Sequence, residues 1–151
     1  MAATKSELVQ NFVVSITEDI KLYQKLLALL QHQKALYLQL DSDALNRNIQ
    51  QQLPVLKKLS YGAKSRTLCL QQLQLPSSEV GVKTLTKALP VKLQTHVAKQ
   101  WAVLEALIKQ CQRYNQENGQ SSAAFHELLG QLMGKPAITY EDKMVCEEYA
   151  R

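Results

Sequence analysis

Two interlocked series of side chains between Leu93 and Leu132 each recur every seven residues. Together they advance in steps of three and four, the pattern of a helix buried along one seam. The pair Asn118-Gly119 ordinarily indicates a turn, but the register passes through it without a shift. The pattern therefore predicts one continuous helix of roughly 40 residues and roughly 60 Å. The series are Trp101, Ile108, Asn115, Ser122 and Leu129, and Leu104, Cys111, Asn118, Phe125 and Leu132.

The middle of this seam is polar, because Asn115, Asn118 and Ser122 fall on the face that should be dry. Two interpretations are open. A polar layer can fix the register and the choice of partner helix. Alternatively, the polar residues mark a weak point where the helix bends or opens to a partner. The first interpretation assigns a structural role to Asn115, Asn118 and Gly119.

A second long helix is predicted near the N-terminus, with Thr4 or Ser6 as its N-cap and an end near Leu40. After Tyr23 it gains an additional apolar row, and a stripe that wide should contact two neighbouring helices. The rows are Val9, Ile16, Tyr23, Leu30 and Tyr37; Val13, Ile20 and Leu27; and Leu22, Leu29 and Leu36.

A third long helix is predicted after Asp41-Ser42-Asp43, an N-cap signal. Gln52 and Arg66 occupy two of its seam positions and form further polar layers. Pro54 predicts a kink near Gln51, and Tyr61-Gly62 is a second weak point. The apolar positions stay in phase, so we expect one bent helix. They are Leu45, Ile49, Leu56, Leu59, Ala63, Leu70 and Leu73.

The remaining segments are short. Residues 74–81 break the periodicity, a short helix is expected over about 78–88, and Pro90 lies close to the start of the long helix. Gly134-Lys135-Pro136 should end that helix. The fold class predicted is all-α: an elongated antiparallel bundle of three long helices with coiled-coil-like packing, one short extra helix and a C-terminal tail. The bundle is assigned to 1–134 and the amphipathic tail to 135–151.

Composition and charge narrow the function classes. Aromatic residues make up only 6% of the chain, as in long-helix proteins. Residues 135–151 carry a net charge of −1, which leaves +6 on the rest. The basic residues are scattered and no cluster interleaves with aromatics, so nucleic-acid binding is a minor alternative. No apolar block is long enough to span a bilayer, and no secretory signal is recognisable. Three widely spaced cysteines suit a reduced, cytoplasmic protein.

Catalytic motifs are missing from the sequence. It contains no phosphate-binding glycine loop, no H-E-x-x-H zinc motif and no G-x-S-x-G nucleophile turn. His126-Glu127 fits a surface pair because no second metal ligand follows at helical spacing. Cys111 lies on the seam, where a thiol acts as a small apolar filler. We therefore expect no enzyme activity, cofactor, metal or small-molecule substrate, and a role in binding other proteins through helical grooves.

The chain resembles flagellar type III export chaperones of the FlgN type over roughly residues 7–140. The Asn-x-x-Asn-Gly element within an unbroken heptad register is the most specific part of the resemblance. After Tyr140 the tail departs from the glycine-rich family pattern, which keeps a sister type of small flagellar or type III secretion chaperone as an alternative. The matching features are Leu26-Leu27-Ala28-Leu29-Leu30 with Lys34-Ala35-Leu36; the spacing Asp41, Leu45, Gln52, Leu56, Leu59, Arg66, Leu70; Trp101, Leu104, Cys111 and Asn115-x-x-Asn118-Gly119; and Tyr140 after a polar linker.

This resemblance implies a cytoplasmic, non-catalytic chaperone whose clients are the hook-associated junction proteins of the flagellum. Their coiled-coil termini are unpaired before assembly, and an exposed heptad seam is prone to aggregation. The chaperone would cover that seam and pass the client to the flagellar export gate. The tail is either docked weakly on the bundle or reserved for a partner. Its expected contacts with client or export gate are Ile138, Tyr140, Met144, Val145 and Tyr149.

A different class of function also fits the wide apolar faces. A self-associating helical scaffold would bury those faces against copies of the same chain. The chaperone, by contrast, is expected to be a monomer or a weak homodimer, so concentration-dependent sedimentation separates the two hypotheses.

Overall fold

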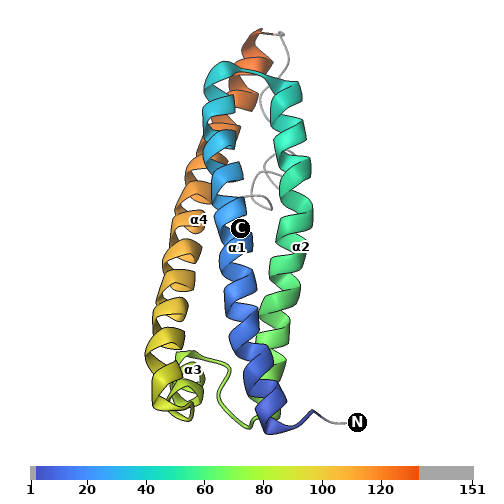
Figure 1. The fold of residues 1–151 in the computed structure, drawn as a ribbon. Helices are drawn as coiled ribbons and strands as arrows, with labels where there is room; N and C mark the ends of the chain where they lie inside the picture. The colour runs from blue at the N-terminus through green and yellow to red at the C-terminus, as the bar shows by residue number, and fades with distance from the viewer. Residues whose placement is uncertain (1–2, 133–151) are drawn as a thin grey trace. The chain divides into compact units, whose positions relative to one another are not determined.

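The protein is all-α, as predicted. A computed structural model describes residues 3–132, with side chains up to Gly130. The helices in chain order are α1 (Lys5–Gln39), α2 (Ser42–Gln72), α3 (Glu79–Lys87) and α4 (Val91–Leu132), and no strand occurs in this described range (Figure 1). The tail contacts predicted over 138–149 lie outside the described residues.

Helix α4 is unbroken over 42 residues and passes straight through Asn118-Gly119. The predicted continuous helix is therefore confirmed. Every predicted seam position from Trp101 to Leu129 is buried or partly buried. Side chains at the seam bury apolar area on one face only, so an unbroken helical period is required to keep them there.

The starts of α1 and α2 follow local capping chemistry. The Thr4 hydroxyl accepts a hydrogen bond from the Glu7 backbone N–H at 3.2 Å, and the Glu7 carboxylate accepts one from the Thr4 N–H at 3.1 Å. This reciprocal capping box starts α1 and confirms Thr4 as its N-cap. An Asp41 carboxylate oxygen accepts a hydrogen bond from the Ala44 N–H at 3.0 Å and caps α2. Helix α2 continues through Pro54, so it is one helix and not two.

The chain groups into two compact units, each with parts of α1, α2 and α4. Within the described range, the first unit comprises residues 3–24 and 55–107 and includes α3. The second comprises residues 25–54 and 108–132. In each unit α2 runs antiparallel to both α1 and α4 (Figure 1).

In the first unit a buried ion pair joins α1 to α2. The Arg66 guanidinium donates to the Asp19 carboxylate at 2.5 Å, and the two side chains are 10% and 4% exposed. Gly62 stands beside this pair, because a Cβ there would lie 2.7 Å from a carboxylate oxygen of Asp19. The glycine at position 62, predicted as a weak point, thus has a packing reason, the close approach of a carboxylate that is held in place by Arg66, and α2 continues through it.

Aromatic and aliphatic side chains form the part of the core of this unit that includes α3. The rings of Phe12 and Trp101 stack with centroids 6.1 Å apart, and Val82 and Leu85 of α3 are buried. Gly81 lies against the connector, where an added Cβ would come within 1.8 Å of the Pro76 carbonyl oxygen. Glycine is therefore required for α3 to pack at this position.

The C-terminus of α2 adopts a left-handed cap without glycine. Gln74 has φ 58°, its N–H bonds to the Gln71 carbonyl, and the Leu75 N–H bonds to the Leu70 carbonyl at 2.9 Å. These two bonds define a Schellman motif with Gln74 at its left-handed position. A side chain in this conformation crowds its own carbonyl group, so the cap carries strain.

Replacing Gln74 by glycine should therefore stabilise the protein by about 1 kcal/mol. Urea unfolding followed by circular dichroism measures the difference. The matched control is Gln50→Gly, an exposed amide in the interior of α2, which should lower stability by about 1 kcal/mol. A loss of stability for Gln74→Gly would contradict the strain assigned to the cap.

Removing one partner of the Asp19–Arg66 pair should be costly. Arg66→Met leaves a buried carboxylate without its counter-charge and should reduce unfolding free energy by about 3–5 kcal/mol. The double variant Asp19→Leu/Arg66→Met should recover much of that loss, since no buried charge remains. Chemical unfolding of both single variants and the double variant measures this coupling, and additive losses would show that the pair is not coupled.

Candidate partner-binding groove

The second unit contains a groove of about 240 Å³ that its three helical segments enclose. We call it the amide groove, because asparagine side chains contribute to its lining. The residues that line it recur at helical spacing on α2 and α4, so they form two ridges. They are Gln33, Tyr37, Ser42, Leu45, Asn46, Ile49, Asn115, Asn118, Gly119, Ser122, Phe125, His126 and Leu129.

One wall of the amide groove is apolar. The rings of Tyr37 and Phe125 meet edge to face with centroids 5.6 Å apart. Leu36 and Leu45 complete this buried cluster, and Leu129 packs against it. The cluster ties all three helices of the unit together.

The floor is a buried network of amide side chains centred on Gln33. The Gln52 amide nitrogen donates to Gln33 Oε1 and to Asn48 Oδ1, both at 2.7 Å. Gln33 itself donates to the Tyr37 hydroxyl at 3.0 Å, and Asn48 donates to the Leu29 carbonyl at 3.0 Å. Gln33, Asn48 and Gln52 are each at most 4% exposed, so these bonds replace the water that the amides lose.

Asn118 joins this network incompletely. Its Nδ2 donates to the Leu30 carbonyl at 2.9 Å and approaches Gln33 Oε1 at 3.4 Å. A carbonyl can only accept, so this contact fixes which amide atom is the nitrogen. The other atom, Oδ1, is buried and has no donor among the described residues. A buried acceptor without a donor is costly.

The predicted polar residues fall into different places. Asn115, Asn118 and Gly119 line the amide groove, whereas Gln52 is buried behind it and bonds to the lining residue Gln33. Arg66 lies in the first unit, paired with Asp19. The sequence prediction missed Asp19, Gln33 and Asn48, which are all buried. The signal was available, because Phe12, Asp19, Leu26 and Gln33 recur every seven residues and all four are buried.

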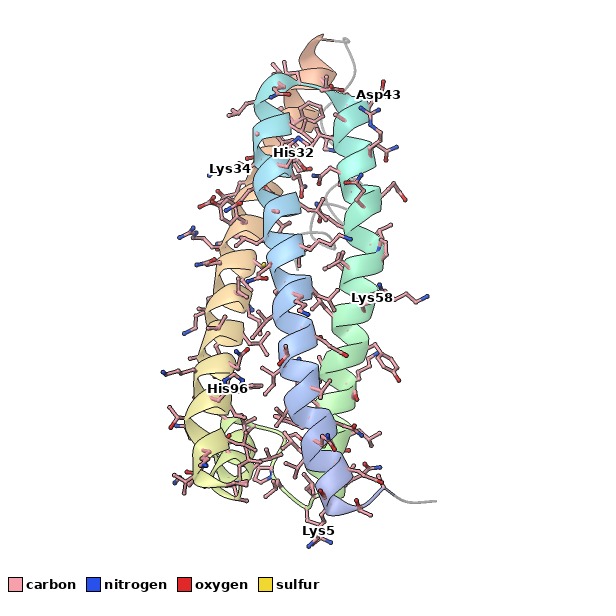
Figure 2. All side chains as sticks on the ribbon, in the orientation of Figure 1. Lys5, His32, Lys34, Asp43, Lys58 and His96 are labelled. Carbon is pink, nitrogen blue, oxygen red and sulfur yellow. The ribbon has the colours of Figure 1, made fainter. Side chains whose placement is uncertain are left out.

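Charged groups lie outside the amide groove. Lys34 of α1 bonds to Glu117 of α4 at 2.8 Å on the surface of the unit (Lys34 is labelled in Figure 2). The hydrogen bond from Lys34 lowers the pKa of the Glu117 carboxyl. His126 and Glu127 are both exposed, as expected of a surface pair.

The two cysteines within the described range are buried. Burial raises the pKa of both thiols, that of Cys111 to about 11. A thiol with a raised pKa is a poor nucleophile, consistent with the filler role predicted for Cys111. Within residues 3–132 there is no cluster of three histidine, cysteine or carboxylate side chains that could hold a metal. The amide groove itself offers apolar side chains and hydrogen-bonding groups, which suit the binding of another protein.

Comparison with known proteins identifies the family of this chain. A family model described as FlgN protein matches residues 1–133. The chain belongs to the FlgN family. None of the curated proteins and none of the solved structures gives a significant match. As a FlgN-family protein, the chain is a flagellar export chaperone in the general sense. In the described part of the protein, no helix combines the length and apolarity needed to cross a membrane.

We expect the native Asn118 to lower the unfolding free energy of the protein. Replacing it by leucine, which has a similar shape, removes the acceptor that lacks a donor, so unfolding free energy should rise by about 1 kcal/mol. Gln33→Leu is the contrasting variant, because it deprives Gln52 and Tyr37 of their partner and should destabilise by about 1–3 kcal/mol. Thermal and urea unfolding compare the two. If Asn118→Leu were the more destabilising, the unsatisfied acceptor would not be a burden.

Proposed function

We propose that this FlgN-family protein receives one helix of a client in the amide groove. The clients are the coiled-coil termini of the flagellar junction proteins, which the chaperone keeps unassembled in the cytoplasm and passes to the export gate. It acts as a non-catalytic monomer or weak homodimer. The observation that carries the proposal is Oδ1 of Asn118, which is buried in a groove and has no hydrogen-bond donor within the described range.

The groove has the geometry of a site for a helix. On α4 its lining advances through residues 115, 118, 119, 122, 125 and 129, and on α2 through 42, 45, 46 and 49. Steps of three and four create holes between side chains, and a further helix can insert its own side chains there. A client seam exposes such side chains before it assembles, because its own partner helices are missing.

Asn118 adds a requirement beyond shape. Because Oδ1 is buried, the seam must open at this level before a client reaches it; a client helix that then places an amide or hydroxyl donor at Asn118 would satisfy Oδ1, whereas a purely apolar helix would leave it unsatisfied. Polar residues at seam positions are the means by which coiled coils select register and partner. The amide groove therefore favours a client seam with a polar residue at a defined place and disfavours generic apolar helices.

The tail supplies the second part of the proposed interaction. We assign Ile138, Tyr140, Met144, Val145 and Tyr149 to contacts with the client or the export gate. A segment that orders only when the client binds reduces net affinity by a few kcal/mol. A reduced affinity suits a chaperone, since the client must be released for export.

The groove is tested with Asn118→Leu and a purified coiled-coil terminus of a junction protein. Isothermal titration calorimetry should show at least about tenfold weaker binding, because the donor on the client loses its acceptor. The matched control is Gln116→Leu, an exposed amide on the same helix that does not line the groove. Equal affinity for Asn118→Leu and the wild type would refute the groove assignment, particularly because this variant is expected to be well folded.

The tail is tested by deleting residues 135–151. Thermal unfolding should remain nearly unchanged, while co-purification of the junction proteins should be lost. A full-length variant with serine at the five apolar tail positions separates loss of those contacts from loss of chain length. Intact client binding by both variants would refute the tail assignment and leave the amide groove as the whole site.

A further inference from the structure

A second groove lies in the first unit between α1 and α2, and none of its lining residues lines the amide groove. It has a volume of about 610 Å³. We call it the α1–α2 groove. Its lining on α1 follows residues 11, 14, 15, 18 and 22, and on α2 residues 57, 58, 61, 62 and 65. Both sets advance at helical spacing, so the two antiparallel helices form parallel ridges with a channel between them.

Three apolar side chains stand among the mostly polar residues that line this channel: Val14 and Leu22 on α1 and Tyr61 on α2. Tyr61 is 77% exposed and Val14 is 47% exposed. Leu68, one helical repeat beyond Tyr61 on the same side of α2, is 54% exposed. Large apolar side chains at helical spacing on both sides of a channel are the anchors that an amphipathic helix uses when it docks.

The charges along α2 determine the chemistry of the occupant. Lys57, Lys58 and Lys64 are exposed and have no carboxylate partner among the described residues, and Lys58 extends from α2 toward solvent (Figure 2). Asp19, which also lines the channel, is neutralised by Arg66. Glu18 is the one other acid in the lining. The α2 rim is therefore positive, and it favours a partner with acidic side chains.

We propose that the α1–α2 groove docks an acidic amphipathic helix of a partner protein. Its apolar stripe lies between Val14 and Tyr61, and its acidic flank faces Lys57, Lys58 and Lys64. A second copy of this chain is a poorer occupant, because a two-fold contact that places α2 against α2 would bring the lysines of both copies together. A channel with two ridges also fits a cylinder better than the flat surface of a membrane.

The probe is a fluorescent three-heptad peptide with leucine at the seam positions and glutamate at the flanking positions. A second peptide carries lysine in place of glutamate. Fluorescence anisotropy with the full-length protein should show that the glutamate peptide binds at least about tenfold more tightly, and that added salt weakens its binding. Equal binding of the two peptides, or no binding of either, would overturn the proposal.

Variants locate the site. The triple variant Lys57→Glu/Lys58→Glu/Lys64→Glu should bind the glutamate peptide about tenfold more weakly. This is the loss expected from three exposed ion pairs together. Lys87→Glu/Lys92→Glu/Lys99→Glu makes the same change in net charge on α3 and α4 and should have no effect. Tyr61→Ser, at an exposed position, should lower the affinity for both peptides because it removes an apolar anchor.

Two further measurements complete the test. One distinguishes the α1–α2 groove from the amide groove, and the other distinguishes a helical partner from a membrane. Asn118→Leu should leave binding of the glutamate peptide unchanged, because Asn118 belongs to the amide groove. Co-sedimentation with phosphatidylserine vesicles tests a membrane partner. If the vesicles bind and the Lys57/Lys58/Lys64 variant releases them while the peptide result is negative, the surface faces a membrane and the helix proposal fails. An equal effect of the control triple variant would likewise contradict it.

Discussion

Polar side chains buried along the helix seams constrain this protein more than any other feature. An amide or a charge that loses water in a helical core must find a partner on a neighbouring helix, so each such group fixes one helix against another. In the first unit this role falls to Asp19 and Arg66, and in the second to the amides around Gln33. Leucine rows alone could slide by one heptad at little cost, whereas these paired groups cannot.

The same principle distinguishes the candidate site from the scaffold. Gln33, Asn48 and Gln52 find hydrogen-bond partners within the unit, and their role is complete in the free protein. Asn118 uses its amide nitrogen in the same network but has no donor for its oxygen within the described range. A stable fold alone gives no reason to retain such a group, because a leucine would fill the space without the penalty. Its presence on a groove with helical ridges supports a binding role.

Two grooves of different character then divide the surface between possible partners. The amide groove is lined by aromatic rings and hydrogen-bonding side chains, so under our proposal it would discriminate by the position of a polar residue in the partner. The α1–α2 groove has lysines along its α2 side, so under our proposal it would discriminate by charge and respond to salt. Each groove lies within one compact unit, and each can be altered by substitution without disturbing the residues of the other.

The sequence by itself determined the helices and their seams. A seven-residue period must continue through α4 if Trp101, Leu104 and Phe125 are all to face one side, and this requirement outweighed the turn signal at Asn118-Gly119. The seven-residue row through Phe12 and Leu26 carried a signal for Asp19 and Gln33, but the sequence could not show which partners would satisfy them or Asn48, because a polar residue at a buried position looks like a surface residue until its partner is known. Tertiary structure alone decided that Arg66 meets Asp19, that Gly62 makes room for that carboxylate, and that the oxygen of Asn118 lacks a donor. Pairing between helices joins residues tens of positions apart, and the period of one helix carries no information about which partner stands opposite.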